Sequence, residues 1–255
     1  MSNGTVLVTG VGRKRGIGAG LARGLAAAGW DLALNYWSDY DSRLDMERGD
    51  SDPEQIADEC RQLGRSVDLV PGDLGDPAVP SNLVRVANKR GDLSALVLAH
   101  TEGVNSGILD TTLESWDRHY AVNARANWLL IKAFAVQLPP AVGEAERGRI
   151  VALTSDHSAH NLPYGTSKGA LDRIVVAAAI ELAEKGIRAN AINPGPIDTG
   201  WMNDEIRASG VEQTPAGRLG TPRDTADLVT FLLSPAGGWV TGQVLYSNGG
   251  FRTTQ

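Results

Sequence analysis

Residues 5–28, TVLVTGVGRKRGIGAGLARGLAAA, decide the fold of this chain. The first four are β-branched or apolar, which indicates a short strand over residues 5–8. A glycine-rich turn follows over residues 9–18, and an apolar helical pattern then covers residues 19–28. A glycine turn at a helix start lets backbone N–H groups and the helix dipole face a pyrophosphate. The order strand, glycine turn and helix therefore predicts a dinucleotide-binding unit.

Strands and helices alternate along the rest of the chain. Further strands are expected at residues 31–36, 66–70, 93–99, 148–154, 187–192 and 244–246, and helices at residues 53–63, 77–89, 113–138 and 164–185. The fourth strand is nearly all apolar, as expected of a parallel strand covered on both faces. We predict a single α/β domain over residues 1–255, a doubly wound parallel sheet of the Rossmann type with seven strands and helices on both faces.

Composition excludes several classes of protein. With 42% hydrophobic and 21% charged residues, the chain is typical of a globular domain and not of a disordered one. A formal charge of −6 argues against a nucleic-acid surface, and no apolar run reaches the length of a membrane span. Residues 1–4 lack the features of a secretion signal, and Cys60 is the only cysteine, which rules out an internal disulfide. We therefore expect a cytoplasmic protein.

Two clusters of polar residues have alternative interpretations. The run 39–52 holds six acidic residues opposed by Arg43 and Arg48, and we interpret it as a solvated loop rather than a binding site. Asp156, His157 and His160 lie close together, as ligands of a metal do, but no H-E-x-x-H pattern accompanies them. We predict no metal site and assign these residues to substrate-facing or solvated positions.

Tyr164 and Lys168 are spaced by four residues in a predicted helix, so their side chains share one face. Pro163 suits the first helical turn, Asn161 is a candidate cap, and Gly186 supplies a stop. A phenol titrates near pH 10, so its use as an acid or base at neutral pH requires roughly 3 pKa units, about 4 kcal/mol, of phenolate stabilisation. A neighbouring ammonium supplies part of that. Because many helices carry this spacing, the case for catalysis depends on the rest of the chain.

A series of short motifs supplies that context. In chain order they are Thr9-Gly10 with Gly16-Ile17-Gly18, Asp73-Leu74, Asn123 in Val122-Asn123-Ala124, Gly148-Arg149-Ile150-Val151 leading to Ser155, Tyr164 with Lys168, Asn193-Pro194-Gly195, residues 218–224, and Thr241-Gly242-Gln243. Through these motifs the chain resembles the classical short-chain dehydrogenase/reductase family over nearly its whole length. Their joint occurrence in this order is highly specific.

The resemblance implies roles for four residues. Tyr164 is expected to donate a proton to a carbonyl oxygen while a nicotinamide delivers hydride to the carbon, and Ser155 to hydrogen-bond the same oxygen. Lys168 is expected to lower the pKa of Tyr164 and to bind nicotinamide ribose hydroxyls, and Asn123 to hold a water that relays protons to the lysine. The expected cofactor contacts, beside Tyr164 and Lys168, are Gly10, Gly16, Ile17, Gly18, Asp73, Leu74, Pro194, Gly195, Ile197 and Thr199.

The chain departs from the family pattern at three places. Five residues separate Gly10 from Gly16, where the usual turn has three, and this longer spacing is similar to that of divergent enoyl-thioester reductases. Leu98-Ala99-His100-Thr101 stands where the family carries an Asn-Asn-Ala-Gly-like sequence. Ser155 lies only nine residues before the tyrosine, so either the loop is shortened or Ser158 takes the role. We favour Ser155 because active groups in such sheets collect at the carboxyl ends of strands.

The choice of cofactor depends on the charges near the adenosine ribose. The second predicted strand ends Asn35-Tyr36-Trp37-Ser38, with no acid before Asp39 to accept hydrogen bonds from the ribose hydroxyls. Arg13, Lys14 and Arg15 in the glycine turn are available to pair with a 2′-phosphate. We therefore predict NADP, with Arg13 and Arg15 among its contacts, and keep NAD as the alternative.

These observations predict an oxidoreductase that transfers hydride between NADP and a small-molecule carbonyl or secondary alcohol. Two alternatives stay open: a 3-oxoacyl-thioester reductase specifically, and a non-catalytic dinucleotide-binding regulatory protein. No nucleic-acid or membrane partner is expected. The helix at residues 164–185 is apolar on nearly every side, so we expect a homo-oligomer, a tetramer as the resemblance implies or else a dimer. Residues 199–215, which should cover the substrate, are too weakly patterned to identify it.

Overall fold

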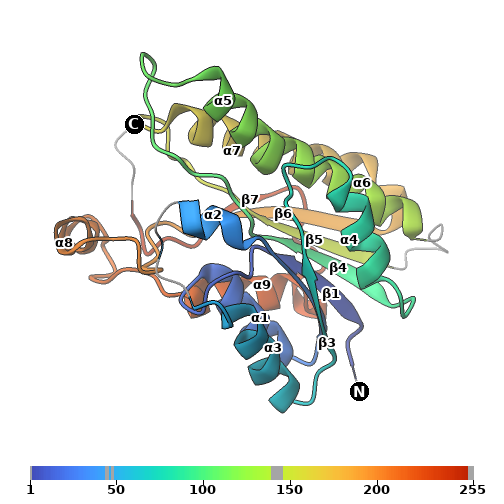
Figure 1. The fold of residues 1–255 in the computed structure, drawn as a ribbon. Coiled ribbons are helices and arrows are strands. Elements are labelled where there is room, and N and C mark those ends of the chain that lie inside the picture. Colours follow the sequence, from blue (N-terminus) through green and yellow to red (C-terminus); the bar gives the residue numbers. More distant parts are fainter. Residues whose placement is uncertain (1, 44–45, 47–48, 139–145, 252–255) are drawn as a thin grey trace.

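The computed structural model describes residues 2–43, 46, 49–138 and 146–251 and contains a seven-stranded parallel sheet in the order β3-β2-β1-β4-β5-β6-β7 (Figure 1). The strands are β1 (Thr5–Thr9), β2 (Asp31–Tyr36), β3 (Val67–Pro71), β4 (Leu93–Leu98), β5 (Gly148–Leu153), β6 (Ile187–Asn193) and β7 (Val244–Tyr246). The predicted fold class is confirmed, and every strand lies within one residue of its expected bounds. The strand order reverses between β1 and β4, and dinucleotides bind outside the carboxyl ends of strands at such a point.

Helices cover both faces of the sheet (Figure 1). One layer contains α1 (Ile17–Ala27), α3 (Asp52–Gln62) and α9 (Pro222–Leu232), and the other contains α4 (Val79–Ala87), α5 (Leu113–Tyr120), α6 (Ala126–Gln137) and α7 (Leu162–Glu181). Alternate residues of β1 enter opposite cores, with Val6 and Val8 under the first layer and Leu7 under the second. The sheet is thus buried on both sides, which is why its strands read as continuous apolar runs.

The helix predicted over residues 113–138 is not continuous. A π-turn, η1 (Ala121–Arg125), separates α5 from α6, and the N–H of Ala126 bonds to the carbonyl of Ala121, five residues back. The turn inserts one residue into the helix, and Asn123 lies within it. The sequence pattern could not reveal this, because a one-residue insertion leaves the helix formers on either side unchanged.

The ends of α7 also differ from expectation. Asn161 precedes the helix, but its side-chain amide donates to Asn105 Oδ1 at 2.8 Å instead of capping a helix N–H. The helix ends at Glu181, and the short 3₁₀ turn η2 (Ala183–Lys185) follows before Gly186 turns the chain at a φ of +70°. The predicted glycine stop is therefore present, four residues beyond the last α-helical bonds.

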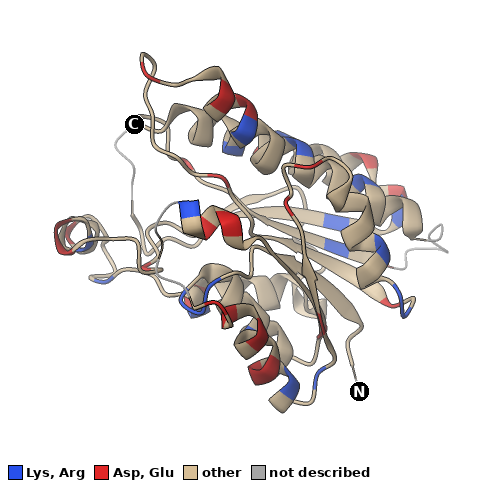
Figure 2. Cartoon of the chain, viewed as in Figure 1, with Lys and Arg blue, Asp and Glu red and all other residues tan. Residues whose placement is uncertain are grey.

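The acidic run at residues 39–52 is not simply a solvated loop. It contains most of helix α2 (Ser38–Arg43), which lies at the carboxyl edge of the sheet and carries charges of both signs (Figure 2). Asp41 and Asp52 are each only 6% exposed. Asp41 pairs with Arg13, and Asp52 accepts a hydrogen bond from the backbone N–H of Lys14. The interpretation as a solvated loop is wrong for these two residues, because cations and N–H groups of the glycine turn stabilise them. Asp45, Glu47 and Arg48 lie outside the described residues.

The weakly patterned segment at residues 199–215 contains helix α8 (Asp204–Glu212). None of the residues of α8 is buried, so the helix has no apolar stripe that a sequence pattern could reveal. After it, α9 begins with a capping box between Thr221 and Asp224, and the 3₁₀ turn η3 (Pro235–Gly237) leads to β7. Among the described residues, no helix is both long and apolar enough to cross a membrane.

Candidate active site

Tyr164 and Lys168 lie on one face of α7, next to the carboxyl end of β5. The Lys168 Nζ lies 5.8 Å from the centre of the Tyr164 ring and donates a hydrogen bond to the carbonyl of Leu153 at 2.9 Å. Lys168 is 3% exposed, whereas Tyr164 is half-buried. The helix spacing seen in the sequence therefore does bring the phenol and the ammonium together.

Burial dominates the titration of both groups. It raises the pKa of Tyr164 above its ordinary value, while a hydrogen bond with Ser155 opposes the rise and Asp156 adds to it. Burial lowers the pKa of Lys168 to about 8, and the Asp172 carboxylate acts in the opposite direction. Desolvation of the phenolate therefore outweighs the hydrogen bond with Ser155 in this structure, and the expected lowering of the tyrosine pKa by Lys168 stays a prediction.

Asp172 is an additional member of this group that the sequence analysis did not single out. It lies four residues after Lys168 on the same helix face, and burial raises its pKa above the ordinary value while Thr154 and Lys168 oppose that rise. The Thr154 hydroxyl donates to the Lys168 carbonyl at 3.3 Å. The spacing Lys-x-x-x-Asp was a signal in the sequence that pointed to this contact.

Of the two candidate serines, Ser155 is the one beside the tyrosine. Its hydroxyl hydrogen-bonds with the Tyr164 side chain and also accepts a bond from the N–H of His157 at 3.1 Å. Ser158 is exposed, as are His157 and His160. Within the described parts of the chain, no three His, Cys, Asp or Glu side chains form a group that could hold a metal ion.

Asn123 is completely buried, and four groups surround its amide. Its Nδ2 donates to the Glu102 carbonyl and to Ser167 Oγ, both at 2.9 Å, while its Oδ1 accepts from the Glu102 N–H at 2.8 Å and from the Thr101 hydroxyl at 3.3 Å. Ser167 in turn donates to the carbonyl of Tyr164. The asparagine is thus held between the segment after β4 and the first turns of α7.

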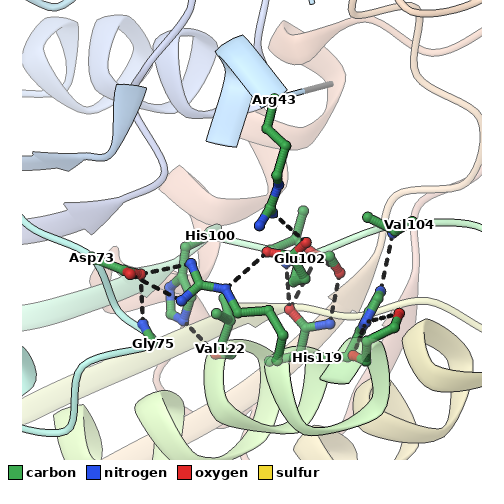
Figure 3. A network of polar contacts seen from close by, with 12 residues as sticks. Arg43, Asp73, Gly75, His100, Glu102, Val104, His119 and Val122 are labelled. Atoms are coloured by element: carbon green, nitrogen blue, oxygen red, sulfur yellow. Dashed lines mark hydrogen bonds and ion pairs between the residues drawn. The ribbon is translucent and has the colours of Figure 1, made fainter. Parts of the chain in front are cut away.

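A chain of charged groups joins Asp73 to α2 (Figure 3). Arg118 grips Asp73 with two hydrogen bonds of 2.8 and 2.9 Å and donates to Glu102 at 3.3 Å. Glu102 is 2% exposed and also pairs with Arg43 at 2.5 Å. Burial acts to raise the pKa of Asp73, but the bonds from Arg118 and Gly75 hold it below its ordinary value. Arg118 and Glu102 were not among the predicted site residues, because no local motif marks them.

The glycine turn has the close backbone approach that a dinucleotide site needs. A Cβ at Gly18 would lie 2.3 Å from the carbonyl oxygen of Gly10, and Gly10 itself has a φ of +78° and lies against Ala99. Helix α1 starts at Ile17 with Gly16 at its N-cap, so its first N–H groups receive no side-chain cap. These features fit a diphosphate, for which free N–H groups at a helix N-terminus are suitable donors.

An anion already lies on this turn. A Cβ at Gly12 would stand 2.7 Å from Asp41 Oδ2, and the other carboxylate oxygen pairs with Arg13 at 3.0 Å. Arg13 also donates to the carbonyl of Thr199 at 3.0 Å, and Arg15 lies 3.8 Å from Asp198. The carboxylate of Asp41 therefore stands in for an anionic ligand, and both arginines point from the turn toward residues 198 and 199.

The remaining predicted cofactor residues follow β6. Gly195 has a φ of +66°, and a Cβ there would lie 2.4 Å from Asn248 Cβ, so only glycine fits. Ile197 is buried and bridges to Gly220, and Thr199 is 7% exposed beside Arg13. The turn is thus rigid, and it lies at the same edge of the sheet as Tyr164.

A family profile described as enoyl-(acyl carrier protein) reductase matches residues 10–252. The chain belongs to the short-chain dehydrogenase/reductase family. An uncharacterized oxidoreductase of Bacillus subtilis, YjdA, is 34% identical over 252 residues, which cover 96% of this chain and 95% of that protein. A chloroplastic NADPH-dependent aldehyde reductase-like protein of Arabidopsis thaliana is 31% identical over 254 residues, which cover 94% and 92% of the two chains. A blue fluorescent protein from a metagenomic library, solved in complex with NADPH, has a TM-score of 0.84 at 30% identity and covers 99% of both chains.

As a short-chain dehydrogenase/reductase, the protein is an NAD(P)-dependent oxidoreductase that transfers hydride. This activity argues against the alternative hypothesis of a non-catalytic dinucleotide-binding regulatory protein.

Proposed function

We propose that Tyr164 is the general acid and base of a carbonyl reductase or alcohol dehydrogenase that favours NADP. The observation that carries the proposal is that Tyr164 lies between two polar groups. Its phenol contacts Ser155, and the buried Lys168 ammonium lies 5.8 Å from the centre of its ring. In the direction of reduction, the phenol O–H breaks as a new O–H bond forms on the substrate oxygen. A bound nicotinamide cofactor would supply the hydride for the carbon, and the glycine turn with Pro194, Gly195, Ile197 and Thr199 would hold that cofactor.

Each neighbour of Tyr164 has a role in this proposal. Ser155 hydrogen-bonds the substrate oxygen and so orients the carbonyl toward the phenol. Lys168, with its pKa of about 8, changes its charge close to working pH and returns a proton to the phenolate after each reduction. Asn123 holds a relay water between the buried lysine and solvent through its backbone carbonyl, because the four bonds of its side-chain amide use both donors and both acceptor positions of that amide. The bonds of Asn123 to Ser167 and Glu102 support this role, because they fix its amide next to the turn of α7 that carries Lys168.

The preference for NADP is supported by the charges at the carboxyl edge of the sheet. The end of β2 carries no carboxylate before Asp39, whereas Arg13 and Arg15 project from the glycine turn. The relatives include proteins whose names specify NADPH. In this proposal a 2′-phosphate replaces the Asp41 carboxylate as the partner of Arg13.

For the substrate we propose a small carbonyl compound or secondary alcohol. A 3-oxoacyl-thioester is the second candidate, favoured by the enoyl-(acyl carrier protein) reductase description of the matching profile. We also propose a cytoplasmic location, which the single cysteine and the absence of any disulfide support. A homotetramer is proposed on the apolar side chains left exposed on the second helix layer: Ile180 is 72%, Val136 73% and Trp128 49% exposed.

The substitution Tyr164→Phe tests the central assignment because it removes only the hydroxyl. Binding of NADPH should be nearly unchanged, and turnover of ketones should fall at least about 100-fold, the scale of acid catalysis. Tyr120→Phe is the matched control, since the Tyr120 ring stacks on Trp116 at 4.9 Å. Turnover of Tyr164→Phe close to that of the wild type would sink the assignment. A parallel panel of acyl thioesters separates the two substrate classes.

A further inference from the structure

The imidazole of His100 joins two segments that carry the proposed site. The ring is 6% exposed, with Nδ1 lying 2.7 Å from the Thr9 hydroxyl and Nε2 lying 3.1 Å from the carbonyl of Val122. A carbonyl only accepts, so Nε2 carries the proton, and Nδ1 accepts the hydrogen of the Thr9 hydroxyl. Burial together with the nearby Lys168 lowers the pKa of His100 to about 3, so the ring is neutral at working pH.

The π-turn makes the carbonyl of Val122 available to His100. In an α-helix that oxygen would accept from the N–H of Ala126, but here that N–H bonds to Ala121 instead. His100 Nε2 supplies a donor to this buried carbonyl. The Asn127 Nδ2 lies 3.3 Å from the same ring nitrogen and donates one hydrogen to the carbonyl of Asn123 at 2.8 Å, whereas the ring is the side chain that contacts the carbonyl of Val122.

Asn123 directly follows Val122, and its position depends on the same turn. The backbone of Glu102, two residues after His100, bonds both ends of the Asn123 amide. The segment after β4 is therefore fixed to the π-turn at two successive points, by the ring of His100 and by the backbone of Glu102. If the π-turn relaxed to α-helical register, the residues after the insertion would rotate by about 100° about the helix axis, and the Asn123 amide would leave Ser167.

We propose that His100 is a positioning residue that stabilises the π-turn through Val122 and so holds Asn123 in place against α7. The inference rests on the proposed relay role of Asn123. It assigns a function to the segment in which this chain departs most clearly from its family, where His100 stands in place of an Asn-Asn-Ala-Gly-like sequence. The ring also anchors this segment to Thr9 at the start of the glycine turn, so one side chain links the cofactor turn with the relay.

Two amide substitutions separate the two bonds of the ring. In His100→Gln the terminal amide nitrogen takes the place of Nε2 and keeps the donor to Val122. In His100→Asn the shorter side chain reaches only the position of Nδ1 and keeps the bond to Thr9. We expect His100→Gln to retain most of the activity, and His100→Asn to lose about 10- to 100-fold in kcat with little change in KM for NADPH, because a displacement of about 1 Å has effects of this size.

His119 provides a matched control. It is also buried and also joins the segment after β4 to α5, since its Nε2 accepts from the N–H of Val104 at 3.0 Å and its Nδ1 donates to the carbonyl of Ser115. It makes no bond with the π-turn that the structure describes. His119→Leu and His100→Leu should therefore destabilise the fold to a similar extent in urea unfolding, while only His100→Leu should lower kcat. If the leucine variants do not fold, the comparison of His100→Gln with His100→Asn carries the test.

Two further measurements distinguish positioning from general structure. The side-chain amide resonance of Asn123, assigned by its disappearance in Asn123→Ala, should shift in cofactor-free His100→Asn and stay in place in His100→Gln. The double variant His100→Asn/Asn123→Ala should be no slower than Asn123→Ala alone, because both changes disable one relay. Full activity of His100→Asn beside an impaired Asn123→Ala would overturn this inference and leave the relay intact. Full activity of Asn123→Ala would instead overturn the relay itself, and the inference with it.

Discussion

The Arg43 guanidinium of α2 lies 2.5 Å from the buried carboxylate of Glu102, which follows β4. The same helix makes a second ion pair, in which Asp41 of α2 pairs with Arg13 of the glycine turn. Between these two ion pairs, the Tyr40 hydroxyl approaches Gly103, next to the ring of Tyr164. Helix α2 therefore covers the carboxyl ends of β1 and β4, where dinucleotides bind in sheets of this order.

Asp41 lies against Gly12 of the glycine turn, so we predict that binding of a dinucleotide there displaces Asp41 and moves α2. Arg43→Gln removes one of the two ion pairs that hold it, and the association rate of NADPH should rise about two- to fivefold, the equivalent of a half-exposed ion pair. Stopped-flow quenching of tryptophan fluorescence measures that rate. Arg90→Gln is the control, because Arg90 pairs with Asp68 on β3, away from α2. A slower association in Arg43→Gln would show that the pair guides the cofactor instead of obstructing it.

Lys168 should make the protein less stable at neutral pH than an apolar residue would. Its pKa falls from the ordinary 10.5 to about 8, so between these values the unfolded chain binds more protons than the folded one, and stability rises with pH. Below about pH 8 the buried ammonium carries its full cost, about 3 kcal/mol. Lys168→Met should therefore unfold at higher urea concentration at pH 7 while losing activity.

The advantage of Lys168→Met should shrink as the pH rises from 8 toward 10, because the folded wild-type lysine then becomes neutral and its burial no longer costs a charge. Lys132→Met is the control, since the Lys132 ammonium lies 5.6 Å from the centre of the half-exposed Trp128 ring. A variant that is less stable than the wild type by the same amount at every pH would contradict the account.

We predict different effects on turnover when each of the two serines is replaced by alanine. Ser155→Ala should lower kcat by about 100- to 1,000-fold, the range for loss of one donor to the reacting oxygen, because Ser155 contacts Tyr164. Ser158→Ala should leave turnover nearly unchanged, since Ser158 is exposed. Steady-state kinetics with one ketone measures both. Loss of turnover in Ser158→Ala alone would show that Ser158, and not Ser155, hydrogen-bonds the substrate oxygen.

Arg13 and Arg15 should contribute to the choice of cofactor. Replacing both by Ala should weaken kcat/KM with NADPH selectively and leave that with NADH nearly unchanged, because only NADPH carries the 2′-phosphate. Since Arg13 also holds Asp41, the single variant Arg15→Ala gives the cleaner measurement. Equal losses with both cofactors would mean that these arginines contact the diphosphate, which NADPH and NADH have in common. Their contacts with residues 198 and 199 agree with that outcome.

The exposed apolar surface of the second helix layer predicts a homo-oligomer in solution, and the family resemblance implies a tetramer. Light scattering at micromolar concentration should give four times the mass of the 27.0 kDa chain. Ile180→Asp should dissociate the assembly, because it places a charge where α7 meets a second copy. Leu63→Asp is the control, since Leu63 is 51% exposed after α3 in the opposite helix layer. A monomeric mass for the wild type would rule the prediction out.

Local patterns were sufficient to predict the sheet and the central pair of the site. The strands appear as short apolar runs because both faces of the sheet are covered, and the glycine turn is recognisable because its backbone geometry excludes other residues. Tyr164 and Lys168 meet because four residues make about one helical turn. In each case the interacting groups are close together in the sequence, so their spacing along the chain is enough to predict how they are arranged.

The sequence by itself thus determined the order of strands and helices, the glycine turn and the face of α7 that carries Tyr164. Only the tertiary structure decided which polar groups are buried and with what partner. Asp41 is buried because Arg13 reaches it, Asp73 is gripped by Arg118 from 45 positions away, and the π-turn is fixed by His100. The physical reason is that a buried charge or carbonyl is stable only with a partner, and these partners come from segments that the folded sheet brings together.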